Sequence, residues 1–201
     1  MKNILKGEQP VHVLRKSLLN MEKSVLGAKE LNDKYFGTDC CKLLYRCDIK
    51  GCKNIDSLLL GILYWGFPTN QHGICSNVLK SYSTLKKMTA YLRKNPNLGI
   101  SQYNILVEEY FNEMHGVGLA FLSKLMFFMN VKIDGYPCVI EDQFVRAGIG
   151  KSGYEELKKL GYISYRKYPK YIAAISNIAA QENITPEELE YRLWSLGKYK
   201  F

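Results

Sequence analysis

The chain has 201 residues, of which 47% are hydrophobic and 23% are charged. That length supports one hydrophobic core or two small lobes, and no apolar run reaches the roughly 18 residues of a membrane span. Lys and Arg together number 28 against 19 Asp and Glu, which gives a formal net charge of +9. Such an excess is typical of proteins that bind a polyanion, but proteins that bind none also show it.

The N-terminal segment lacks the continuous apolar core of a signal peptide, so we expect a cytoplasmic protein with no membrane partner. Cysteines should then be free thiols. Four of the six lie within CCKLLYRCDIKGC, residues 40–52. Zinc ligands are usually paired about two to four residues apart, a spacing that Cys41, Cys47 and Cys52 do not match. We expect buried free thiols in this cluster, with zinc binding as the alternative.

Helical periodicity dominates the rest of the chain. Asn54 or Asp56 is the candidate cap of one buried helix, and Thr185 with Glu188 forms a capping box at the start of the last. No segment reads as a strand, and 131–139 reads as a loop. The pattern predicts an all-α fold of nine or ten helices. The expected helices cover 11–31, 54–66, 76–95, 101–114, 119–130, 141–148, 153–161, 168–183 and 185–197.

The stretch FNEMHGVGL, residues 111–119, separates two of these helices. Gly116 and Gly118 would let the backbone turn at positive φ and approach a ligand closely, because neither has a Cβ. Val117 would pack between the helices. The helix that follows presents free N–H groups at its start, which favours a phosphate. The alternative is an ordinary helical hairpin with a glycine cap.

FNEMHGVGL resembles the hairpin of the helix-hairpin-helix DNA glycosylase superfamily, and VIEDQFVRAGI, residues 139–149, resembles the segment with its essential aspartate. Together with ILYWGFPTN, GVGLAFLSKLMFFM and PEELEYRLWSLGK, these segments are similar to a bacterial group described as 8-oxoguanine DNA glycosylase-like. The resemblance implies that residues 1–201 form one compact helical domain of two lobes around a cleft. The helix-hairpin-helix motif would lie at about 101–130.

The resemblance also implies an activity. The protein would rotate a damaged purine, 8-oxoguanine, out of double-stranded DNA and excise it as a monomer without a cofactor. In bifunctional members a lysine just past the hairpin attacks the sugar and forms a Schiff base, which adds AP-lyase activity. The superfamily's iron–sulfur cluster is excluded, because no cysteine follows Asp142. The rival function is a DNA-binding module that keeps the hairpin but has no catalysis.

Lys124, inside the apolar run LAFLSKLMFFM, is the candidate nucleophile, because burial favours the neutral amine that can attack. Asp142, eighteen residues further on, would assist proton transfer and stabilise positive charge on the sugar. In the best-known members the lysine stands where this chain has Ala120. The alternatives are that the Lys124 stem reaches solvent or a phosphate, and that Asp142 only caps a helix.

The remaining candidates are expected to contact DNA. The proposed phosphate contacts are His115, Gly116, Val117, Gly118 and Arg146. For His115 and Arg146, a place on the solvated surface is an equal alternative. Trp65, Phe67 and Trp194 are candidates for the pocket that receives the base, although core packing would also account for them. The segment 158–171 interleaves Lys, Arg and Tyr, which suits either a sugar-phosphate backbone or a solvated surface.

Overall fold

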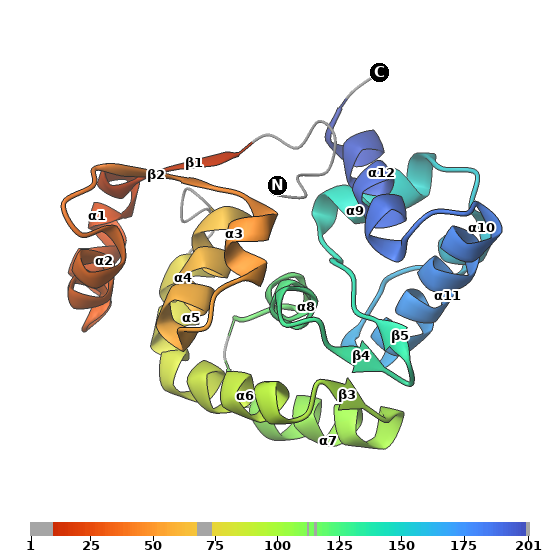
Figure 1. Ribbon diagram of the computed structural model, residues 1–201, viewed down its shortest axis with the longest axis horizontal. Coiled ribbons are helices and arrows are strands. Elements are labelled where there is room, and N and C mark those ends of the chain that lie inside the picture. The colour runs from red at the N-terminus through yellow and green to blue at the C-terminus, as the bar shows by residue number, and fades with distance from the viewer. Residues whose placement is uncertain (1–9, 68–73, 112, 115, 200–201) are drawn as a thin grey trace. The chain divides into compact units, whose positions relative to one another are not determined.

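The computed structural model describes residues 10–67, 74–111, 113–114 and 116–199 (Figure 1). Twelve α-helices and two small sheets lie within these ranges, so the fold is all-α as predicted. The chain divides into two compact units, the first of residues 1–94 and 108–117 and the second of residues 95–107 and 118–201. That the units are the lobes of a single domain stays a prediction.

The first unit consists of short helices and one two-stranded sheet. Its elements are β1 (Val11–Leu14), a 3-10 helix (Arg15–Leu18), α1 (Leu19–Ser24), α2 (Ala28–Phe36), β2 (Cys41–Leu44), α3 (Arg46–Lys50), α4 (Ile55–Gly66), α5 (Ile74–Lys80) and α6 (Tyr82–Lys94), with the end of α7 (Ile100–Phe111). The buried helix α4 begins as predicted, because the Asn54 side chain accepts a hydrogen bond of 2.9 Å from Ser57 N.

The expected helix over 11–31 is wrong at its start. Residues Val11–Leu14 form β1, which pairs antiparallel with β2 in a register that places Val11 opposite Leu44. Val13 is fully buried whereas Leu14 is 44% exposed, which is the alternation of a strand. The strand was missed because its partner lies about thirty residues further along the chain, and a local period contains no information on that pairing.

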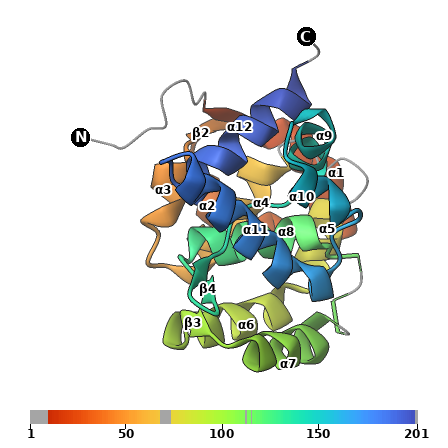
Figure 2. The same cartoon turned by 90° about the vertical axis from the view of Figure 1, so that its right-hand side faces the viewer.

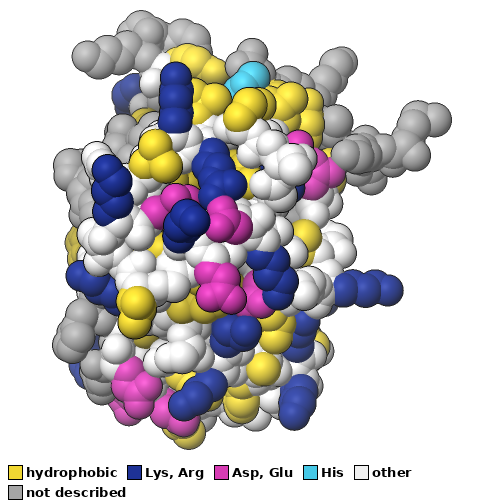
Figure 3. All heavy atoms as spheres, turned by 90° about the vertical axis from the view of Figure 1, so that its left-hand side faces the viewer, with side chains coloured by type: hydrophobic (Ala, Val, Ile, Leu, Met, Phe, Trp, Pro, Cys, Tyr) yellow, Lys and Arg dark blue, Asp and Glu magenta, His cyan; other side chains and the backbone are white. Residues whose placement is uncertain are grey.

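Charges of both signs are mixed on the face of the molecule that carries α1 and α2 (Figure 3). Asp33 pairs with Lys29 at 3.7 Å and also with Arg15. Asp56 pairs with Lys86 at 2.9 Å. The net positive charge of the chain is therefore not gathered into one basic patch on this face.

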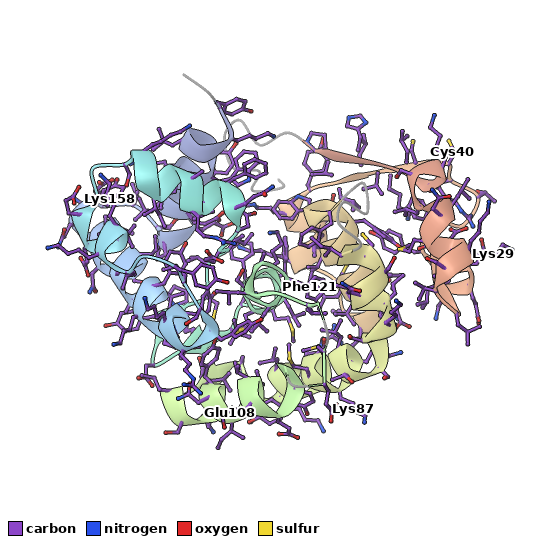
Figure 4. All side chains as sticks on the ribbon, turned by 180° about the vertical axis from the view of Figure 1, so that it is seen from behind. Lys29, Cys40, Lys87, Glu108, Phe121 and Lys158 are labelled. Carbon is purple, nitrogen blue, oxygen red and sulfur yellow. The ribbon has the colours of Figure 1, made fainter. Side chains whose placement is uncertain are left out.

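The clustered cysteines differ from the expectation of buried thiols. All six cysteines are free, but Cys40, labelled in Figure 4, and Cys41 are exposed, and Cys47 and Cys52 are half-buried. The reason is that Cys41 lies on β2, whose sheet has only two strands and leaves much of that strand in solvent. The described residues contain no group of three or more His, Cys, Asp or Glu that could hold a metal ion.

The second unit contains the longer C-terminal helices. Its elements are β3 (Asn97–Leu98), the start of α7, α8 (Leu119–Phe128), β4 (Lys132–Ile133), β5 (Tyr136–Pro137), α9 (Gln143–Lys151), α10 (Glu155–Lys159), a 3-10 helix (Tyr165–Lys167), α11 (Tyr168–Gln181) and α12 (Pro186–Lys198). The capping box of Thr185 and Glu188 at the start of α12 is confirmed. None of the described helices is long and apolar enough to cross a membrane.

The expected loop at 131–139 contains a tight hairpin instead. β4 pairs antiparallel with β5 and parallel with β3. Asp134 and Gly135 turn the chain between β4 and β5 at φ values of 49° and 84°. Strands of two residues give no recognisable alternation, which is why the sequence indicated a loop.

Helices α9 and α12 lie side by side in both ribbon views (Figures 1 and 2). Their backbones approach so closely that a Cβ on Gly148 would collide with the carbonyl oxygen of Leu193. A Cβ on Gly197 would likewise collide with the carbonyl oxygen of Phe144. The two glycines therefore allow α12 to pack directly against the helix that Asp142 begins.

Candidate active site

Helix α8 carries the candidate nucleophile in an almost wholly buried setting. Every residue of α8 except Ala120 is buried, including Phe121, which is labelled in Figure 4. Lys124 is only 2% exposed, so its stem does not reach solvent. The alternative in which the ammonium lies in water is therefore wrong, and a cation in this position needs an anion nearby.

Asp142 supplies that anion. Lys124 Nζ donates a hydrogen bond of 2.9 Å to Asp142 Oδ2 within the second unit. The other carboxylate oxygen, Oδ1, accepts from the backbone N–H groups of Phe144 at 3.0 Å and Val145 at 3.1 Å. Asp142 is thus the N-cap of α9 and the partner of Lys124 at once, and capping does not exclude a part in catalysis.

The surroundings of Asp142 hold it in its ionised form. Burial by itself raises the pKa of the carboxyl group, but the Lys124 ammonium and the two backbone N–H donors outweigh this effect. The net result is a pKa lowered from its ordinary value. The pair is therefore a buried ion pair whose acid stays charged at neutral pH.

Three hydroxyl groups fix the chain segment that leads into Asp142. Ser123, next to Lys124 on α8, accepts from Glu141 N at 3.0 Å and donates to Glu141 O at 3.2 Å. Tyr168 Oη donates to Val139 O at 2.7 Å, and Tyr171 Oη donates to Ile140 O at 3.1 Å. Both tyrosines are fully buried, so these two members of the Lys-Arg-Tyr segment 158–171 are unavailable to DNA.

Glu141 is a functional candidate that the sequence reading did not single out. Its side chain is completely buried, and Arg146 Nε lies 2.7 Å from its Oε1. The N–H is not aligned with that oxygen, and neither carboxylate oxygen accepts a hydrogen bond from any described residue. Burial raises the pKa of Glu141 to about 7 despite the Arg146 charge. In the sequence, Glu141 could have been noticed as an acid that follows the apolar run CVI and directly precedes Asp142.

Trp194, a candidate for the base pocket, lies on α12 among other aromatic rings. Tyr191, one turn earlier, stacks on it with centroids 5.7 Å apart and planes 17° apart. Lys198 Nζ, one turn later, lies 4.4 Å from the ring centroid. Phe144 of α9 meets the ring edge-on at 6.1 Å. Trp194 is half-buried among these contacts, and its role in a base pocket stays a prediction.

The hairpin residues do not behave alike. Gly116 has a φ of 74°, and a Cβ there would collide with the Asn77 side chain, so glycine is required at this position. Gly118 has a φ of −93°, which corrects the expectation of positive φ at both glycines. Apart from its two chain neighbours, no atom of the described residues lies within 4 Å of a Cβ built on Gly118, which leaves its backbone open to approach. Val117 is buried as expected, and His115 lies outside the described residues.

The other base-pocket candidates, Trp65 and Phe67, lie at the end of α4 in the first unit. The guanidinium carbon of Arg46 lies 5.2 Å from the centre of the Trp65 ring. Phe67 caps α4 and its carbonyl oxygen accepts from Cys75 Sγ at 3.4 Å. Both side chains are half-buried. Residues 68–73 lie outside the described part of the chain.

An all-α chain in which a buried lysine contacts an aspartate at the start of the next helix fits the class of DNA-repair glycosylases. Comparison with known families supports this class. The model of the family described as "Putative 8-oxoguanine DNA glycosylase OGG-like protein" matches residues 49–194. This match covers more than half of the chain, so the chain belongs to this DNA glycosylase-like family, as the sequence predicted. Searches of curated proteins and of solved structures found no match.

Proposed function

We propose that the protein removes an oxidised purine, in the first place 8-oxoguanine, from double-stranded DNA and then cuts the strand through a Schiff base on Lys124. The contact of 2.9 Å between Lys124 Nζ and Asp142 Oδ2 carries this proposal. It brings an amine nucleophile and a carboxylate together in a buried place, which is the pairing that covalent displacement of a base requires. The family match supports the substrate class.

In the proposed reaction Lys124 Nζ, after losing a proton, attacks C1′ of the flipped nucleotide. The bond from C1′ to the base breaks, and the base leaves with the bonding electrons and takes up a proton. The sugar ring then opens to an imine between Nζ and C1′, with a proton added to the ring oxygen. Loss of the C2′ proton expels the 3′ phosphate and cuts the strand. Asp142, whose pKa is lowered, would offset the positive charge that develops on the sugar.

The start of α8 would anchor the phosphate backbone. Gly118 is exposed, no side chain caps the helix there, and space is open where a Cβ would stand. Backbone N–H groups at such a helix start bind phosphate without reading sequence. Arg146, with a side chain 40% exposed, would contribute a second phosphate contact.

The rival function is DNA binding without catalysis. The burial of Lys124 favours it, because attack on a sugar requires the ammonium to leave Asp142 and meet the substrate. In that case the ion pair would only hold α8 against the start of α9. The position of Ala120, where better-known glycosylases have their lysine, favours it as well.

Borohydride trapping on a duplex with one 8-oxoguanine separates the two functions. The wild type should form a covalent adduct that Lys124→Gln cannot form, since glutamine keeps much of the length and loses the amine. Lys132→Gln, which changes an exposed lysine of β4 in the same unit, should trap normally. If Lys124→Gln still traps, another lysine is the nucleophile. If the wild type forms no adduct and releases no base from any duplex with an oxidised purine, the protein is a DNA-binding module without catalysis.

A further inference from the structure

The guanidinium of Arg146 is held at two points and open elsewhere. Its Nε lies 2.7 Å from Glu141 Oε1, and its central carbon lies 5.7 Å from the centre of the Tyr162 ring. Within the described part of the chain, no further hydrogen bond or ion pair of Arg146 is found, which leaves Nη1 and Nη2 available. Two parallel guanidinium donors match two oxygens of a phosphate.

Glu141 is buried behind this guanidinium without any hydrogen bond to its carboxylate oxygens in the described residues. The charged and titratable groups around it include Arg146 on α9, Lys124 on α8 and the neighbouring Asp142. Tyr171 on α11 interacts with Glu141 and also with the buried Glu190 of α12. Burial raises the pKa of Glu141 most, Arg146 and Lys124 lower it, and the result is about 7. A carboxylate in this setting depends on the nearby cations to remain ionised.

We propose that Arg146 binds a DNA phosphate, and that Glu141, which positions the guanidinium, takes up a proton from solvent when the phosphate binds. This inference rests on the proposed function, because the phosphate that Arg146 binds is taken to be part of the DNA substrate. A phosphate at Nη1 and Nη2 draws on the same positive charge that keeps Glu141 ionised, and adds negative charge close to it. No described residue donates a hydrogen bond to the Glu141 carboxylate that would compensate for the loss, so protonation relieves a buried charge that has lost its compensation.

Linkage fixes the sign of the effect. A complex that holds one more proton than the free partners forms more readily at low pH. DNA affinity of the wild type should therefore fall by about tenfold between pH 6.5 and 8.5, as Glu141 of the free protein loses its proton. Glu141→Gln imitates the protonated acid. It should bind as tightly as the wild type at pH 6.5, bind about tenfold more tightly than the wild type at pH 8.5, and show no such pH dependence.

The test is fluorescence anisotropy on a duplex with a stable abasic-site analogue, at constant ionic strength. Arg146→Gln should bind more weakly and lose the pH dependence, and adding Glu141→Gln to it should change nothing further. Glu155→Gln is the matched control, because it removes one charge from the same unit at an acid that pairs with Lys158 on α10. Figure 4 shows Lys158 at the outside of the molecule. This control should keep the wild-type slope.

Two outcomes overturn the inference. In one, Glu141→Gln keeps the wild-type pH dependence or binds more weakly at every pH, and Glu141 is then only part of the core. In the other, the wild type does not bind the duplex. Failure of the proposed function is detected by a different experiment. Borohydride trapping reports on the reaction of Lys124 and does not depend on the protonation of Glu141. A wild type with proton-linked binding but no adduct would retain the inference and exclude the covalent mechanism.

Discussion

Glu141 and Asp142 are adjacent in the chain, but their carboxylates lie in opposite surroundings. Asp142 accepts hydrogen bonds from Lys124 Nζ and from two backbone N–H groups, and its pKa is lowered. The Glu141 carboxylate accepts none from the described residues, and its pKa is raised to about 7. Glu141 is completely buried, the Asp142 side chain is only 14% exposed, and both acids lie near a cation. At Asp142 the Lys124 charge and the hydrogen bonds to the carboxylate together outweigh burial, whereas at Glu141 burial outweighs the Arg146 charge, which is not joined by such hydrogen bonds from the described residues.

In the proposed function the two acids therefore have different roles. Asp142 is ionised at every pH at which the protein would work, as required of a group that offsets developing positive charge. Glu141 lies near the midpoint of its titration at neutral pH, as required of a group that exchanges protons with a binding event.

The largest effect should come from Asp142→Asn. Because the amide keeps the shape and loses the charge that stabilises the transition state, base release should slow by about two to three orders of magnitude. Glu141→Gln, assayed at pH 6.5 with saturating DNA, should stay within about threefold of the wild type, since its acid is buried away from substrate. Single-turnover release of 8-oxoguanine measures both. Equal losses in the two variants would mean that the acids act as one unit.

An effect of medium size is expected on the free energy of unfolding when Glu141 is replaced. Its pKa in the folded protein lies above the ordinary value of 4.5. Protonation of Glu141 therefore contributes fully to the stability of the fold below pH 4.5, and this contribution is lost as the pH rises through about 7. Glu141→Gln removes this loss. At pH 8 it should be more stable than the wild type by about 2 kcal/mol, and at pH 5 the difference should be small.

Urea denaturation at the two pH values checks this, with Glu155→Gln as the control. The Glu155 variant should shift the midpoint little at either pH, because its acid is exposed. A gain of the Glu141 variant that is the same at pH 5 and pH 8 would show that packing, and not titration, is responsible.

Much of this site could be predicted from the sequence because it depends on local features. Lys124 stands out as the charged residue within an apolar run, and Asp142 follows at the spacing of the family it resembles. Their contact and the caps at Asn54 and Thr185 agree with the predicted helices. The family match over 49–194 confirms the resemblance, while the roles of the site residues stay predictions.

The features that the sequence did not predict depend on contacts between distant residues, which a local sequence pattern does not reveal. Sheet β1–β2 joins residues about thirty positions apart, and Gly148 is required only because α12 crosses there. Glu141 looked like an ordinary acid beside a helix cap. Its raised pKa arises from burial and from the absence of a donor among the described residues, neither of which a sequence displays.

The smallest effect should come from Ser123, whose hydroxyl group joins α8 to the segment that carries both acids. Ser123→Ala leaves the buried Glu141 N–H without its acceptor and removes the bond to Glu141 O. This should cost about 1–2 kcal/mol in the free energy of unfolding at any pH, because no titrating group loses a partner. Ser176→Ala is the control. Its hydroxyl donates only to Ile172 O one turn back in α11, so its loss should cost less than about 0.5 kcal/mol. If the Ser123 variant costs no more than this control, the segment before Asp142 is held by Tyr168 and Tyr171, and α8 contributes to it through the Lys124–Asp142 pair alone.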